Sequence, residues 1–466
     1  MVKKIIKNFT ALFTGEVIAR LCHFVSVVYI ARMLGAAGFG AINFALAVIS
    51  YFLMATNLGL GELGVREVAR KHDVREMAGT ILSMRLSIAL ISFAVVLIMA
   101  VFLNKSPSTI YLIVAYGFTL FPYALSVEWV FRGIEQMKYN AYGRIINAIL
   151  YVGLIFLVVK KPQDILKVAM ITILADFVSC IFYYANYTKK FGPIRFHFDL
   201  KKWFSISHVS AQLFFSSALL TVYLGFGTVA LGFMKNEEAV GFYGAAYKLI
   251  LVFYAISDVF VAAIFPVASR LYHESKERLQ EFIRYCVKAA LSLGMPIAVG
   301  GLLLGPRIIK LIYGSSYGEA GPLLQIISWF AAINLTSYAL SYLLVACDRQ
   351  HIYLAILGCG TAFNIVFNLV AIRFIGYYAP SIALVLTETI ILIMSFIAMR
   401  KLVALPIARL SIKPLASAVF MGGMILVFFK LNIVALVGLA AILYLGALFA
   451  IGGITKVEVE KVREAF

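Results

Sequence analysis

The chain has 466 residues, of which 63% are apolar and only 14% are charged, and its mean hydropathy is +0.96. A soluble domain is about 45–50% apolar and about 25% charged. Because no water-soluble fold buries so much apolar surface, the composition excludes a soluble enzyme, a disordered chain and a disulfide-rich secreted domain. The net charge is +19, from 41 Lys and Arg against 22 Asp and Glu. In a soluble protein such a charge would indicate binding to nucleic acid. In a membrane protein the positions of the Lys and Arg residues have to be considered first, because cations collect in cytoplasmic loops.

Apolar runs of spanning length predict an all-α polytopic membrane protein with about 14 transmembrane helices. The runs are apolar on all faces, which excludes the alternating strands of a membrane barrel. The first run carries Glu16, Arg20 and His23, so it is not the apolar core of a signal peptide. The predicted spans are 9–33, 40–61, 79–103, 108–131, 142–160, 165–188, 205–232, 239–268, 284–304, 322–346, 352–376, 378–400, 411–430 and 433–455.

The Lys and Arg residues between the spans predict the orientation, because cations collect in cytoplasmic loops. With the N-terminus inside, 26 of the 41 lie on the inner side, 9 on the outer side and the remaining 6 within spans. The outer set is Arg32, Lys105, Lys160, Lys161, Lys235, Arg307, Lys310, Arg373 and Lys430. We therefore expect both termini to be cytoplasmic, with Lys3, Lys4 and Lys7 at one end and Lys456, Lys461 and Arg463 at the other. This bias toward the inner side accounts for most of the net positive charge, so the charge does not require a nucleic-acid partner.

A weak internal repeat predicts the domain organisation. The stretch 40–45 (GAINFA) aligns with 241–246 (GFYGAA), 201 positions further on. An even number of spans per repeat keeps both halves in the same orientation, and chance similarity between apolar helices is the alternative. The predicted regions are an N-terminal six-helix lobe at 1–188, a cytoplasmic linker at 189–204, a C-terminal six-helix lobe at 205–400, and two additional helices with a cytoplasmic tail at 401–466.

Charged residues inside spans are costly and are therefore candidate functional residues. Glu16, Arg20 and His23 lie on one helical stripe because their spacings are 4 and 3. One interpretation is a cavity wall at which Arg20 binds an anionic substrate and Glu16 takes part in ion coupling. The other is a local Glu16–Arg20 pair that neutralises itself.

The span 239–268 carries a stripe of Tyr243, Tyr247, Tyr254 and Asp258, with Lys248 beside it. Tyrosine rings can stack on sugar rings and hydrogen-bond their hydroxyl groups, although such stripes also pack helices together. We take Lys248, Tyr247 and Tyr254 as candidate substrate-binding residues and Asp258 as a candidate ion-coupling residue.

Five further charges lie within or near the ends of spans. Three of them are cations that could contact a lipid diphosphate or could extend to the lipid headgroups: Arg85, Arg144 and Lys288. We take Arg85 and Lys288 as candidate substrate-binding residues. Asp176 and Glu388 are lone carboxylates that could carry coupled protons, or each could pair with a cation elsewhere in the fold.

Several catalytic and cofactor signatures are missing from the sequence. It has no phosphate-binding Gly-x-x-x-x-Gly-Lys motif, no Cys or His cluster at metal spacing and no nucleophile with a plausible base. We therefore expect no enzyme activity, no cofactor, no metal and no catalytic residue. The five cysteines are not expected to form structural disulfides.

Local motifs resemble the polysaccharide-export and O-antigen (Wzx-type) flippase branch of the multidrug/oligosaccharidyl-lipid/polysaccharide exporter superfamily. The most specific is Trp129–Tyr139 (WVFRGIEQMKY), which is similar to the W-x-F-x-G-x-E-x-M loop of that branch. Tyr378–Ala383 (YAPSIA) departs from the Gly-Ala-Ala run usual in relatives. The other matching stretches are ARMLG at 31–35 with Phe39-Gly40, NLGL at 57–60, VREVAR at 65–70, and IYG at 312–314 followed by Tyr317 and Ala320.

The resemblance implies two six-helix lobes around a central cavity that opens alternately to each side of the cytoplasmic (inner) membrane. It implies export of a polyprenyl-diphosphate-linked oligosaccharide for surface polysaccharide assembly. The expected partners are that lipid-linked oligosaccharide, membrane lipids, and a polysaccharide polymerase or glycosyltransferases, but not nucleic acid.

Three alternatives are a peptidoglycan lipid-precursor flippase, a multidrug cation exporter of the same fold, and, from another functional class, a membrane glycosyl polymerase. A peptidoglycan lipid-precursor flippase handles the same diphosphate lipid end. A multidrug cation exporter would favour carboxylates over the cations Arg20, Arg85, Arg144, Lys248 and Lys288. A membrane glycosyl polymerase would be expected to have a large outer loop, whereas the longest predicted outer connector, 305–321, contains no His and one carboxylate.

Overall fold

The computed structural model describes residues 2–70 and 73–453, and the side chains from Gly15 onward except those of 212, 213 and 216. The predicted basic tail residues Lys456, Lys461 and Arg463 lie outside the described residues. Within the described ranges the chain is helical and contains no strand, which confirms the predicted fold class. Thirteen described helices are long and apolar enough to cross a membrane, so the protein is a multi-pass membrane protein.

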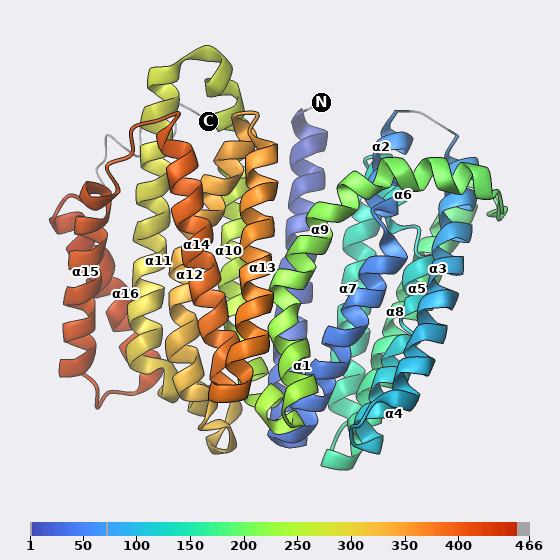
Figure 1. The fold of residues 1–466 in the computed structure, drawn as a ribbon, viewed down its shortest axis with the longest axis horizontal. Helices are drawn as coiled ribbons and strands as arrows, with labels where there is room; N and C mark the ends of the chain where they lie inside the picture. Colours follow the sequence, from blue (N-terminus) through green and yellow to red (C-terminus); the bar gives the residue numbers. More distant parts are fainter. Residues whose placement is uncertain (1, 71–72, 454–466) are drawn as a thin grey trace. The chain divides into compact units, whose positions relative to one another are not determined.

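The chain forms two compact units, coloured blue to green and yellow to red in Figure 1. The first is Met1–Gly232 with Asn236–Gly241, and the second is Phe233–Lys235 with Phe242–Phe466. This division falls one helix later than the linker predicted at 189–204. The residues 192–199 of that linker do separate two helices without being helical themselves.

The helices of the first unit begin with one that contains two predicted spans. They are α1 (Val2–Asn57), α2 (Leu60–Ala69), α3 (Val74–Phe102), α4 (Pro107–Gly117), α5 (Leu120–Leu125), α6 (Glu128–Gly133), α7 (Met137–Val158), the short 3₁₀ turn η1 (Pro162–Asp164), α8 (Ile165–Phe191) and α9 (Leu200–Met234).

Helix α1 corrects the prediction of a loop between the first two spans. Its 56 residues would extend about 84 Å if straight, far more than the roughly 30 Å hydrocarbon core. It bends at Gly35, whose φ of 69° and ψ of 178° suit only glycine. The α1 ribbon in Figure 1 leaves the N-terminus and turns back toward α2. Two spans therefore meet at one residue without an intervening loop.

The predicted span 108–131 is not one continuous helix but three short ones, α4, α5 and α6. Pro122 has no N–H to donate to the carbonyl of Phe118, four residues earlier, and the helix breaks at Phe118 and Thr119. Tighter i to i+3 hydrogen bonds replace the helical ones there, including Phe121 N to Phe118 O at 3.2 Å.

Among its described residues, the second unit contains seven helices of 18 to 38 residues and one short 3₁₀ turn. They are α10 (Glu237–Glu274, whose first turn belongs to the first unit), α11 (Lys276–Tyr313), η2 (Ser315–Tyr317), α12 (Ala320–Ala346), α13 (Gln350–Ile375), α14 (Tyr378–Arg400), α15 (Ile407–Val427) and α16 (Ile433–Ala450). Helix α11 continues through Pro306 to Tyr313, so the outer connector predicted at 305–321 is shorter than expected.

A close helix crossing in the first unit matches the register of the predicted repeat. A Cβ on Gly40 would lie 1.6 Å from the carbonyl oxygen of Glu237, and a Cβ on Gly241 would lie 2.0 Å from that of Ala36. Both pairings follow the 201-residue offset, because Gly241 corresponds to Gly40 and Glu237 to Ala36. The residues that correspond under this offset therefore make reciprocal close approaches. Small residues allow the backbones to approach this closely.

Candidate functional site: charged and aromatic groups within the spans

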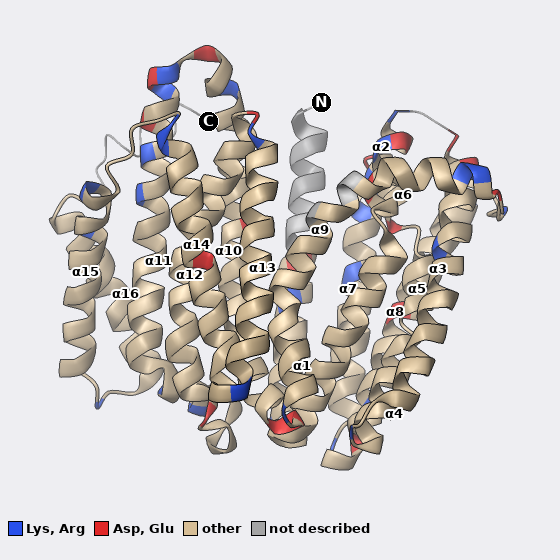
Figure 2. Cartoon of the chain, in the orientation of Figure 1, with Lys and Arg blue, Asp and Glu red and all other residues tan. Residues whose placement is uncertain are grey.

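Charged residues gather near the helix ends, and few lie along the spans (Figure 2). Those few mark candidate sites, because a charge in a membrane span faces a polar space or pairs within the bundle.

An ionic network in the first unit links α1, α6 and α7. Glu16 accepts a hydrogen bond from Arg20 Nε at 2.7 Å and also pairs with Arg144. Arg144 Nη2 then contacts Glu128 Oε1 at 3.2 Å, and Asn140 Nδ2 donates to the same oxygen at 3.2 Å. The order along the network is thus Arg20, Glu16, Arg144, Glu128 and Asn140.

This network contains features of both interpretations of the Glu16–Arg20 stripe. Its two cations and two carboxylates balance, as in the self-neutralising pair. Yet Arg20 is 53% exposed, and its only described hydrogen bond uses Nε. The two Nη groups of its guanidinium fork therefore have no acceptor among the described residues. An exposed, half-engaged guanidinium inside a membrane span is suited to binding an anion.

Arg85 lies apart from this network and is only 5% exposed. It donates to Asn57 Oδ1 and its guanidinium lies 5.7 Å from the ring centre of Tyr123. Asn57 in turn donates to Glu62 at 3.1 Å. The Nε atom of Arg85 is buried without a hydrogen-bond partner in the described structure. Arg85 therefore packs α3 against the end of α1 in this conformation, and a ligand could reach it only after a rearrangement.

Asp176 on α8 has a neutral partner rather than a cation. Its Oδ1 accepts a hydrogen bond from Asn147 Nδ2 on α7 at 2.9 Å, and no Lys or Arg of the described chain is within ion-pair distance. The cationic partner considered from the sequence is thus not present among the described residues. A lone carboxylate of this kind can gain or lose a proton without breaking an ion pair.

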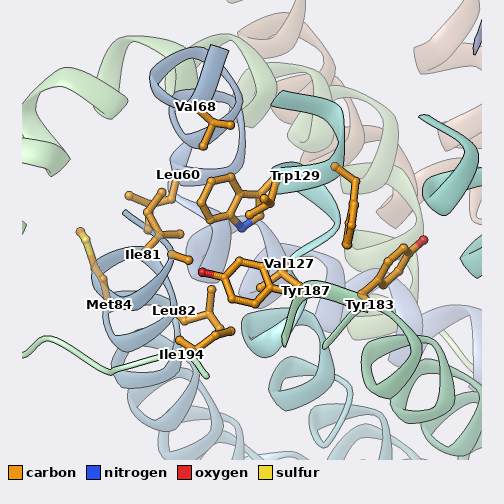
Figure 3. Close-up of a cluster of buried hydrophobic side chains, with 13 residues drawn as sticks. Leu60, Val68, Ile81, Leu82, Met84, Val127, Trp129, Tyr183, Tyr187 and Ile194 are labelled. Carbon is orange, nitrogen blue, oxygen red and sulfur yellow. The ribbon is translucent and has the colours of Figure 1, made fainter. Parts of the chain in front are cut away.

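The Trp129–Tyr139 motif forms a packing core and a tight turn. Trp129 is 2% exposed and packs with Leu60, Val68 and Ile81 in the cluster shown in Figure 3. Glu135 adopts a positive φ of 57°, and Gln136 N donates back to the carbonyl of Phe131 at 2.8 Å. The most specific sequence signature therefore fixes how α2, α6 and α7 join.

The tyrosine stripe on α10 in the second unit divides into two groups. Tyr243 and Tyr247 stack with ring centres 5.5 Å apart and are both buried, so they pack the helix. Lys248 is half-buried and has no hydrogen-bond or ion-pair partner among the described residues. Lys288 is half-buried on α11. The structure does not join these two cations into one group.

The other group extends across three helices and includes residues that the sequence analysis missed. Tyr254 and Asp258 on α10 meet Tyr338 and Tyr342 on α12, and Tyr353 on α13 continues the row. The spacing of Tyr338 and Tyr342, four residues apart in one span, is the signal that could have identified them.

Glu388 on α14 is only 2% exposed, and its carboxylate accepts a hydrogen bond from Ser337. Glu388 is therefore buried, whereas Asp258 is exposed. The two carboxylates of the second unit thus have different environments.

Comparison with known proteins agrees with the resemblance. The family model described as polysaccharide biosynthesis protein matches residues 5–272, more than half of the chain, and a MatE model matches 213–370. The chain is 25% identical over 394 residues to a protein of Shigella dysenteriae described as an O-antigen transporter, covering 83% of this chain and 98% of the relative. It is 25% identical over 359 residues to the capsular polysaccharide biosynthesis protein CapF of Staphylococcus aureus, covering 74% and 87%.

Solved structures show the same fold. The lipid II flippase MurJ in an inward closed conformation superposes with a TM-score of 0.78 at 14% identity, over 94% of this chain and 97% of that one. An inward-facing multidrug resistance transporter of the MATE family gives 0.64 at 16% identity, over 82% and 94%. The chain therefore has the fold of these two proteins, and it belongs to the polysaccharide biosynthesis protein family.

Proposed function

We propose that this protein is a flippase that moves a polyprenyl-diphosphate-linked oligosaccharide from the cytoplasmic to the outer leaflet of the cytoplasmic membrane. Its family and its relatives, which are described as O-antigen and capsular polysaccharide proteins, support the substrate class. The cation bias between spans supports cytoplasmic termini.

The observation that carries this proposal is the exposed guanidinium of Arg20 within a spanning helix. Moving a diphosphate through hydrocarbon requires groups that replace its water, and an Arg fork provides charge-assisted hydrogen bonds to phosphate oxygens. The adjacent carboxylate Glu16 is already engaged by two arginines, so the network presents a cation rather than an anion. This arrangement disfavours a cationic drug as the substrate.

The test is translocation by the purified full-length protein in lipid vesicles. Fluorescently labelled, lipid-linked oligosaccharide extracted from membranes of the source cells is placed in both leaflets, and a membrane-impermeant quencher reports exchange. We expect faster exchange of this lipid than of the peptidoglycan precursor. Equal exchange in protein-free vesicles would contradict the proposal, and faster exchange of the peptidoglycan precursor would favour that alternative.

Ion coupling remains part of the proposal. Asp176, Asp258, Glu388 and Glu16 are the candidate carboxylates, and Asp176 is the best placed in the first unit because it has no competing cation. A proton gradient imposed across the same vesicles would distinguish coupled from downhill movement.

A further inference from the structure

The row of aromatic side chains in the second unit has chemistry that the ionic network of the first unit lacks. Building on the flippase proposal, we propose that Tyr254, Tyr338, Tyr342, Tyr353 and Asp258 form a binding surface for the sugar headgroup. We call these five residues the tyrosine platform. Its ligand class is a pyranose-containing oligosaccharide, bound through ring faces and hydroxyl groups.

The rings of the platform form a continuous row across α10, α12 and α13. The ring centres of Tyr254 and Tyr338 are 5.5 Å apart, those of Tyr338 and Tyr342 are 4.7 Å apart, and those of Tyr342 and Tyr353 are 5.5 Å apart. All four tyrosines are half-buried rather than enclosed. They are therefore partly accessible, in contrast to the buried Tyr243 and Tyr247 pair on the same helix.

Asp258 shows that this row faces a polar space. Its side chain is exposed although it lies in the spanning helix α10, and it forms no described ion pair. A carboxylate facing lipid would be strongly unfavourable, so carboxylates in spans face water-filled space or the bundle interior. The hydroxyl of Tyr338 donates to Asp258 Oδ1 at 2.9 Å, which holds the carboxylate against the rings.

The chemistry of this arrangement matches a pyranose. One face of a sugar ring is made of C–H groups that pack on aromatic rings, while its rim carries hydroxyl groups. A carboxylate accepts about four hydrogen bonds, and Tyr338 uses one of them, so Asp258 retains acceptors for sugar hydroxyl groups. The hydroxyl group of Tyr342, which accepts from Tyr338 at 3.4 Å, can still donate its own proton.

The competing explanation is that the tyrosines only pack the three helices. Conservative variants separate the two explanations, because Tyr338→Phe keeps the ring and removes the hydroxyl, and Asp258→Asn keeps the shape and removes the charge. Neither change creates a cavity, so both variants should fold. Tyr243→Phe, on the same helix but buried away from the platform, is the matched control.

The experiment measures binding to the purified full-length protein in lipid nanodiscs with two probes. One is the lipid-linked oligosaccharide extracted from source membranes, and the other is undecaprenyl diphosphate, which has no sugar. For Asp258→Asn and Tyr338→Phe we expect binding of the first probe to weaken about tenfold, with unchanged binding of the second. Tyr243→Phe should match the wild type with both.

Each other outcome overturns a defined claim. If both variants bind both probes like the wild type, or lose both equally, the platform is not a sugar site, while the flippase proposal stands. If the wild-type protein binds neither probe, the flippase proposal itself fails, and the platform proposal fails with it.

Discussion

Replacing Arg20 by alanine should separate transport from folding. The side chain is 53% exposed and makes one described ion pair, with Glu16 at 2.7 Å. Because exposed pairs of this kind contribute about 0–1 kcal/mol, Arg20→Ala should change the free energy of unfolding by less than about 1 kcal/mol. Glu16 keeps its contact with Arg144, so the substitution leaves no unpaired carboxylate.

The effect on substrate binding should be much larger. A hydrogen bond from a charged group to phosphate is worth about 1.5–3 kcal/mol, which corresponds to roughly a tenfold to 150-fold loss of affinity. Arg20→Lys should retain part of the activity, because it keeps the charge but loses the planar fork. By contrast, Arg144→Ala should lower stability as well, because it leaves Glu16 and Glu128 without their shared cation.

The assay combines exchange of lipid-linked oligosaccharide in vesicles with a thermal unfolding measurement on the same preparations. Arg409→Ala is the matched control, since Arg409 is exposed and forms no described ion pair. Wild-type exchange by Arg20→Ala at normal protein level would show that the cation is structural and would remove the main reason for preferring an anionic lipid substrate.

Four other outcomes can be measured. Gly40→Ala should destabilise the protein by about 1–3 kcal/mol in thermal unfolding, because the new Cβ would meet backbone atoms, whereas Gly153→Ala, with no atom within 4 Å, should not. Trp129→Ala should cost about 3–5 kcal/mol and sharply reduce the amount of folded protein on size-exclusion chromatography. If Asp176 carries coupled protons, Asp176→Asn should fold normally and abolish the pH dependence of exchange; unchanged pH dependence would exclude that role. A cysteine at Ser315 should react with an impermeant thiol reagent added outside intact cells, and labelling only after permeabilisation would reverse the predicted orientation.

The sequence predicted the helices well because long apolar runs leave few other structures in a membrane. It did not predict the ends of several helices. Gly35 joins two spans without a loop, Pro122 divides another span, and Pro306 lies within a helix that continues to Tyr313. Composition cannot separate these cases, because a helix tolerates or breaks at a proline according to whether its neighbours satisfy the freed carbonyl group.

The candidate site was only partly predictable for a related reason. The i, i+4 spacing indicated the Glu16–Arg20 pair, since one helix brings those residues together. Arg144 and Glu128 join them through tertiary packing of other helices, which a single sequence does not encode in any local pattern. Tyr338 and Tyr342 had a local signal but no visible link to Asp258.

The ionic network explains how a cation can be kept in a membrane span and still be available to a substrate. If Arg20 and Glu16 formed an isolated pair, binding a phosphate to Arg20 would leave a carboxylate without its cation, and that cost would offset the gain. Here Arg144 also contacts Glu16, so Arg20 can turn toward a phosphate while Glu16 remains paired. Glu128, which also accepts a hydrogen bond from Asn140, in turn holds Arg144 in place. The carboxylates of the network thus lower the cost of inserting the arginines without preventing anion binding by Arg20.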